Sequence, residues 1–155
     1  MAQSIITNWG KAFLSSAAFQ NLDPDGAALP STLYIILVDS TFTGWTGTSD
    51  PDLENISSIT GRVNPSGNYT GNSVARSALG FTVTKDTTND RGVVTFTTAP
   101  IITAAANLTN IQGYALCTAN SSTTAKIITL QKFDAIYSLT ASQTGTITAA
   151  SMLVT

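Results

Sequence analysis

The sequence predicts a mainly β protein, an antiparallel β-sandwich or a jelly-roll-like barrel, with one short N-terminal helix. Three observations predict this class. Short apolar or alternating segments recur between turn-rich segments along most of the chain. The 155 residues include 26 threonines and 16 serines, and the β-branched threonine favours strands. A helical apolar spacing occurs only near the N-terminus. The length is that of one domain, residues 1–155.

The N-terminal segment predicts the helix, over residues of about 4–19. Ile5, Trp9 and Phe13 recur at a spacing of four, which places them on one helical face. Residues 23–26 read Asp-Pro-Asp-Gly, a turn in which proline fixes φ and glycine supplies a positive φ. We therefore expect the helix to end shortly before this turn.

The next two segments predict a buried strand and a long loop. Residues 33–38 form an uninterrupted apolar run of strand length, which indicates a strand buried on both faces. Residues of about 40–72 contain five glycines and two prolines, which break any long element. We expect one short strand there, around residues 59–63. A connection this long inside a small domain usually has a functional role or forms an interaction surface.

The second half of the chain predicts strands joined by polar turns. Apolar and threonine side chains alternate at the spacing of two that a strand requires. Residues 85–92 are polar and predict a hairpin loop. In the last predicted strand the apolar phase shifts, which predicts a bulge near Ala149-Ala150. The expected strands cover residues 79–84, 94–97, 111–117, 126–133 and 144–154.

The composition excludes several kinds of chemistry. Without histidine there is no His-based catalytic triad and no His metal site. The single cysteine, Cys117, forms no intrachain disulfide and no cysteine metal cluster, and we expect it to be buried and inert. Asp50, Asp52 and Glu54 lack the spacing of a calcium loop, so we interpret them as solvated. We expect no enzyme activity, no cofactor and no bound metal.

The number of charged residues and the lengths of the apolar runs indicate which kinds of partner to expect. Seven basic and nine acidic residues give no electrostatic footprint for a nucleic acid. No apolar run approaches the roughly 20 residues of a membrane-spanning helix. With so few charges, strand edges lack the lysines and glutamates that usually guard them. We therefore expect neither a nucleic-acid nor a membrane partner, and we expect self-association.

A few side chains are candidates for contact with a partner. They are Trp9, Phe13, Trp45, Tyr69 and Arg76. Trp45 lies in a glycine-rich segment, and we expect it to be exposed and to be the better anchor for a ligand or partner. Sugars could also stack on Trp9, Tyr69 or Tyr137, although packing is the favoured interpretation of each aromatic side chain. Arg76 is expected in a partly buried ion pair or an interface contact.

The order of the segments resembles a family of small structural proteins of tailed bacteriophages. The family pattern is a short helix, a Pro-x-x-Leu/Val-Tyr strand, a glycine-rich loop ending in Tyr-x-Arg, and later strands. Here Tyr69 is displaced from Arg76, so that one motif departs from the pattern. The matching segments are Pro30–Leu37, Gly67–Tyr69, Val74–Arg76, Gly92–Thr97, Gly113–Cys117 and Ser142–Ile147. The resemblance implies an all-β virion component without catalytic residues.

This resemblance implies a location on the phage particle. The expected function is that of a capsid decoration (cement) protein, made in the host cytoplasm, that binds the major capsid protein as a homotrimer and stabilises the head. The helix and the 40–72 loop are the expected contact regions. The alternative is a tail, baseplate or fibre protein that binds a host glycan receptor through Trp45 and the hydroxyl-rich loops. A lectin-like module of non-viral origin is the third hypothesis.

Overall fold

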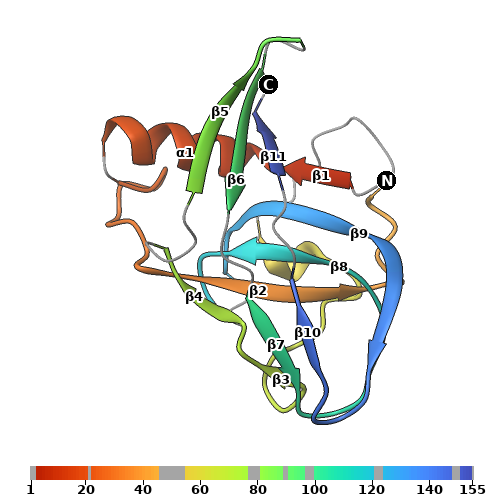
Figure 1. Ribbon diagram of the computed structural model, residues 1–155. Helices are drawn as coiled ribbons and strands as arrows, with labels where there is room; N and C mark the ends of the chain where they lie inside the picture. Colours follow the sequence, from red (N-terminus) through yellow and green to blue (C-terminus); the bar gives the residue numbers. More distant parts are fainter. Residues whose placement is uncertain are drawn as a thin grey trace.

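The computed structural model confirms a mainly β fold, sandwich-like, with one short N-terminal α-helix (Figure 1). It describes residues 3–20, 22–45, 55–76, 81–88, 91–96, 100–120, 124–147 and 151–154. The elements are β1 (Gln3–Ile6), α1 (Asn8–Phe19), β2 (Thr32–Asp39), the 3-10 helix η1 (Ile56–Ser58), β3 (Tyr69–Thr70), β4 (Ser73–Ala75), β5 (Phe81–Asp86), β6 (Arg91–Phe96), β7 (Ile101–Ala104), β8 (Leu108–Cys117), β9 (Ile127–Leu139), β10 (Thr144–Thr146) and β11 (Ser151–Val154).

The strands form antiparallel sheets. The central sheet has the strand order β1-β9-β8-β2-β4, and two smaller sheets have the orders β10-β7-β3 and β11-β6-β5. Figure 1 shows the two small sheets at opposite ends of the molecule, with the central sheet between them. Within the described residues, no helix has the length and apolar character that a membrane crossing requires.

Strand β2 is buried on both faces, as its unbroken apolar run predicts. Leu33, Ile35 and Leu37 pack into one cluster of core side chains, and Ile36 and Val38 pack into a second. Because neighbouring side chains on a strand point to opposite faces, the two clusters lie on opposite sides of the central sheet.

Helix α1 and the β10-β7-β3 sheet supply the first core cluster. Trp9 and Phe13 come from the helix, Ile102 from β7, Tyr69 from β3, and Ile147 from the chain just after β10. The central sheet and the β10-β7-β3 sheet therefore share one core, which is the arrangement of a sandwich.

The segment that follows β2 supplies the second core cluster. Phe42, Trp45, Ile56 and Ile59 are all buried against the far face of the central sheet. The predicted loop of residues 40–72 therefore packs much of its described part onto the core. The predicted short strand at 59–63 is wrong: only an isolated bridge joins Arg62 to Val38.

The N-terminal prediction is wrong for its first residues. The chain forms strand β1, in which Ile5 pairs with Leu130 of β9, before the helix begins at Asn8. Thr7, in an extended conformation, is the N-cap. Ile5 and Ile6 are β-branched and are both buried, so pairing with β9 uses them better than a first helical turn would.

The last predicted strand, 144–154, is also wrong. It is two strands in different sheets, because Thr146 of β10 pairs with Ile101 of β7 and Met152 of β11 pairs with Val94 of β6. The predicted bulge near Ala149-Ala150 lies outside the described residues. Strands β3, β4 and β7, of two to four residues, are too short for an alternating pattern to reveal.

The predicted hairpin is present, but its loop is shorter than the predicted 85–92. Strands β5 and β6 pair from Phe81 with Phe96 to Asp86 with Arg91, so both ends of the predicted loop belong to the strands. The predicted strand 126–133 is also present, but β9 continues to Leu139. That extension shapes the site described next.

Candidate binding site

Four of the five predicted contact residues lie in the core, and two of them come from the helix. Trp9 and Phe13 are buried on α1, with their rings stacked at a centroid distance of 5.2 Å. Their spacing of four places both on the face of the helix that packs against the central sheet.

Trp45 is not exposed, and that prediction is wrong. Only 2% of the residue is accessible to solvent. Phe42 packs edge-on against its indole, with the ring centroids 5.0 Å apart at 87°. On β8, a Cβ at Gly113 would lie only 2.6 Å from the indole, so the absent side chain makes room for Trp45. Gly113 thus gives the Trp45 indole room to pack against the sheet.

Tyr69 is buried, and its side chain connects strand β2 to the segment that precedes β3. Its hydroxyl accepts a hydrogen bond from the backbone N–H of Leu37 at 3.0 Å and donates one to the carbonyl of Val63 at 3.1 Å. Burial raises the pKa of this hydroxyl well above its usual value. Tyr69 therefore holds the structure together and has no free hydroxyl to offer a ligand.

Arg76 lies just after β4 and is partly buried. Its Nε donates a hydrogen bond to the carbonyl of Pro30 at 3.0 Å, and its backbone N–H donates to Ser31 at 2.8 Å. These bonds tie the end of β4 to the start of β2. A contact between Arg76 and a partner stays a prediction.

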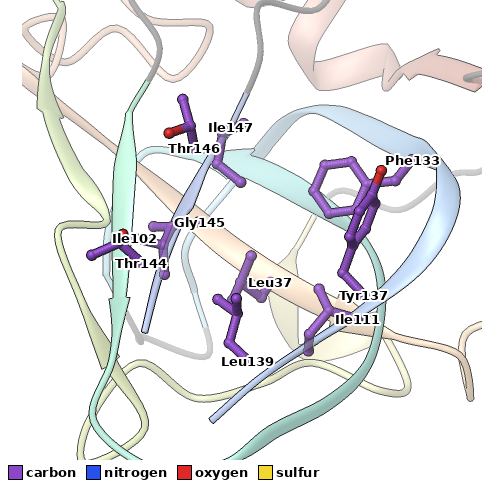
Figure 2. Close-up of a pocket in the computed structure, with 10 residues that line it drawn as sticks. All are labelled: Leu37, Ile102, Ile111, Phe133, Tyr137, Leu139, Thr144, Gly145, Thr146 and Ile147. Atoms are coloured by element: carbon purple, nitrogen blue, oxygen red, sulfur yellow. The ribbon is translucent and has the colours of Figure 1, made fainter. Parts of the chain in front are cut away.

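A cavity of about 340 Å³ opens between the end of β9 and strand β10. Figure 2 shows the rings of Phe133 and Tyr137 on one side, β10 on the other, and Leu37 between them. Most of the lining side chains are apolar: Leu37, Ile102, Ile111, Phe133, Leu139 and Ile147. The lining also includes Thr144, Gly145 and Thr146 of β10 but no charged residue.

A bend in β9 creates one wall of the cavity. In the register with β8, Gly113 pairs with Lys132 and Ile111 pairs with Tyr137. Between these two pairs, β8 advances by two residues and β9 by five. Residues four apart on a straight strand would be about 13 Å apart. Instead the rings of Phe133 and Tyr137 meet edge-on at 5.6 Å.

A bulge in β8 compensates on the opposite strand. Between the pair Ile111–Tyr137 and the pair Leu108–Leu139, β8 advances by three residues and β9 by only two. Asn110 absorbs the extra residue with a φ of 57°, a left-handed conformation that asparagine tolerates. Its carbonyl accepts from Ser40 N–H at 2.9 Å, and its own N–H donates to Ser138 Oγ at 3.2 Å.

One side chain that lines the cavity is exposed. Tyr137 is 53% exposed, and its neighbour Ile136, which is not part of the lining, is 55% exposed. On β10, a Cβ added to Gly145 would lie 3.2 Å from the Leu139 side chain, so a larger residue there would begin to fill the cavity. Because burying a charge without a partner is costly, this lining selects an uncharged, apolar group.

Sequence reasoning found only part of this site. Tyr137 was expected as an aromatic side chain on which a sugar could stack, but the cavity and the exposed Ile136 were missed. The available signal was Ile136, Tyr137 and Leu139 beyond Phe133, where the predicted strand ended. The cavity itself depends on the bends in β8 and β9, which no local pattern encodes.

The described residues offer neither a cluster of metal ligands nor an exposed cysteine. No group of three or more His, Cys, Asp or Glu residues that could hold a metal ion occurs among them. Asp50, Asp52 and Glu54 lie outside the described part of the chain. Cys117 is fully buried, and this burial raises the pKa of its thiol well above the usual value. The thiol is therefore protonated and inaccessible in the folded protein.

Comparisons with protein-family models, with curated proteins and with solved structures find no match to this chain. The geometry of the site is that of an apolar cavity with threonines along one edge and an aromatic side chain at its mouth. Such a site binds by shape and by burial of apolar surface rather than by charge.

Proposed function

We propose that this chain is a bacteriophage capsid decoration (cement) protein that binds the major capsid lattice as a homotrimer and stabilises the head. The observation that carries the proposal is the open apolar cavity lined by the exposed Tyr137, whose neighbour in β9, Ile136, is also exposed. Exposed apolar surface of this kind marks a protein interaction site. The order of the sequence motifs, which resembles small phage structural proteins, supports the choice of partner.

The structure changes which surface we propose for these contacts. Much of the described part of the 40–72 segment packs on the core, as do Trp9 and Phe13 of the helix. The proposed contact surface is therefore the mouth of the cavity, at the end of β9 and along β10.

A decoration protein of this kind acts by multivalent binding and needs no chemistry. If a homotrimer binds through three equivalent surfaces, the second and third contacts form at a high effective concentration. Each contact can then be weak while the whole trimer dissociates slowly. A well-packed core supports this mode because it holds the contact surfaces in a fixed arrangement.

The test is the number of copies on the purified phage particle. We expect many copies per head for the native chain, and at least a tenfold loss of occupancy for the double variant Ile136→Asp, Tyr137→Asp. Quantitative mass spectrometry against the major capsid protein measures the ratio. Leu22→Asp is the control, because Leu22 is also partly exposed but lies between α1 and β2, outside the cavity.

Two results would overturn the proposal. One is a native chain found in only a few copies, at the tail. The other is a double variant that keeps full occupancy while its melting temperature, measured on purified protein, equals that of the control.

The alternative function is a tail, baseplate or fibre protein that binds a host glycan. The observation that favours it is the exposed ring of Tyr137 across the cavity from Thr144 and Thr146, since sugars stack on aromatic rings and bond to hydroxyls. Binding of the purified chain on a glycan array, lost in Tyr137→Ala, would support this role. The copy number on the particle separates it from the decoration role.

A further inference from the structure

The small sheet β10-β7-β3 has an exposed aliphatic side chain on its outer face. Ile101 of β7 is 56% exposed, whereas its neighbour Ile102 is 1% exposed and lines the cavity. Because successive side chains on a strand alternate, Ile101 points away from the cavity. In the register, Ile102 pairs with Gly145 and Ile101 pairs with Thr146, and both of these β10 residues belong to the lining. One thin sheet thus separates an exposed isoleucine from an open apolar cavity.

The surroundings of Ile101 match the cavity in charge. Strands β3, β7 and β10 read Tyr-Thr, Ile-Ile-Thr-Ala and Thr-Gly-Thr, without a single charged residue. The lining of the cavity is also uncharged. When two such surfaces meet, apolar area leaves water and no charge is buried without a partner. A branched aliphatic side chain is also small enough for a cavity of about 340 Å³.

We propose that the cavity between β9 and β10 is filled by Ile101 of a second copy of this chain. Within the described residues, the chain itself carries the kind of group that the cavity selects: large, aliphatic, exposed and set in an uncharged sheet. Tyr137, which lines the cavity and is exposed, then packs against the outer face of the incoming sheet. The inference rests on the self-association part of the proposed function and names its contact.

This contact is head-to-tail. The projecting residue and the cavity are different surfaces, so each copy uses its own Ile101 toward one neighbour and its own cavity toward the other. Such contacts close into a ring when the rotation between copies allows it, and a rotation of 120° gives the proposed homotrimer. In this arrangement, the isoleucine of one copy completes the cavity of the next.

Cysteine cross-linking between different variants tests the contact directly. Ile101→Cys and Tyr137→Cys are prepared as separate proteins, mixed and oxidised. Cys117 stays out of the reaction because it is fully buried. We expect a disulfide-linked dimer in the mixture and none in either protein alone. A mixture of Ile101→Cys with Leu22→Cys is the matched control, and we expect no dimer in it.

Dimers of Ile101→Cys alone would overturn the head-to-tail contact, because they indicate a symmetric one. Equal yields in the two mixtures would also overturn it, because they indicate random collision.

Light scattering provides the second measurement. We expect the native chain at micromolar concentration to have three times its mass of 16.1 kDa, and Ile101→Asp to have the mass of one chain. Gly145→Val, which begins to fill the cavity from its own side, should also be monomeric. Ile101→Val should keep the native mass. Melting curves establish that each variant is folded.

A native chain that is monomeric, or an Ile101→Asp variant with unchanged mass, would overturn the inference. Because these experiments use the purified chain alone, they are independent of capsid occupancy. A trimer whose mass ignores Ile101 would remove this contact and leave the decoration proposal standing. A tail location would remove the decoration proposal and leave this contact standing.

Discussion

Thr7 joins two elements through one hydroxyl group. Its Oγ1 accepts a hydrogen bond from the backbone N–H of Gly10 at 2.9 Å, which caps α1, and donates one to the carbonyl of Ile127 in β9. The residue has no exposed surface. Removal of the hydroxyl would leave both backbone groups buried without this partner.

We therefore expect Thr7→Val to lower the free energy of unfolding by about 2 kcal/mol, the sum expected for a lost cap and a lost buried hydrogen bond. Valine keeps the shape and removes only the hydroxyl. Thr7→Ser, which keeps the hydroxyl and loses a methyl group, should cost less. Urea unfolding followed by circular dichroism measures both, and a serine variant less stable than the valine variant would contradict this role.

Helix α1 lies unusually close to β9 at Gly10. A Cβ at this position would lie within 2 Å of the carbonyl oxygen of Ile128, so no side chain fits without movement of the helix. Glycine weakens an isolated helix by about 1 kcal/mol relative to alanine. Here the close packing against the sheet requires it.

Gly10→Ala should therefore destabilise the protein by about 2 kcal/mol or more, although alanine favours the helix, because the backbone must shift and core contacts are lost. Ser15→Ala on the exposed face of the same helix is the matched control and should stay within about 0.5 kcal/mol of the native chain. Thermal melting of the two variants measures the difference. If Gly10→Ala proves as stable as the control, the close approach of α1 to β9 is wrong.

At the scale of elements, local patterns predict the strands that carry a clear apolar or alternating pattern of their own. The β5–β6 hairpin follows from two alternating segments joined by a polar turn, and β2 follows from its apolar run. Strands β1 and β10 do not, because their pairing partners, β9 and β7, are selected by the sheet and not by the residues beside them. The prediction that Trp45 is exposed is wrong for a related reason, since Gly113, which makes room for its indole, lies on the distant strand β8.

At the scale of the whole molecule, the core holds three groups that lose a proton at alkaline pH. Burial is the largest cause that raises the pKa of Cys117, Tyr69 and Tyr114 above their usual values. In the unfolded chain these groups ionise near 9.0 for cysteine and near 10.0 for tyrosine. Above those values the unfolded state binds fewer protons than the folded state, so stability falls as the pH rises.

We therefore expect the melting temperature to change little through these groups below about pH 8 and to fall steadily above about pH 9, where unfolded cysteine begins to ionise. Cys117→Ala should remove the earliest part of the fall and leave the part that begins near the pKa of unfolded tyrosine. Scanning calorimetry at a series of pH values measures both chains. A melting temperature that rises between pH 9 and 10.5 would contradict the burial of these groups.

The sequence by itself determined the mainly β class, an N-terminal helix but not its start at Asn8, the doubly buried strand β2 and the absence of histidine chemistry. All of these follow from composition or from contacts between residues close in the chain. Only the tertiary structure decided that Trp45 is buried, that residues 144–154 divide between two sheets, and that a cavity opens beside Tyr137. Each depends on pairing between distant segments and on the offsets at Asn110 and in β9, where chain geometry rather than local propensity sets the position of every side chain.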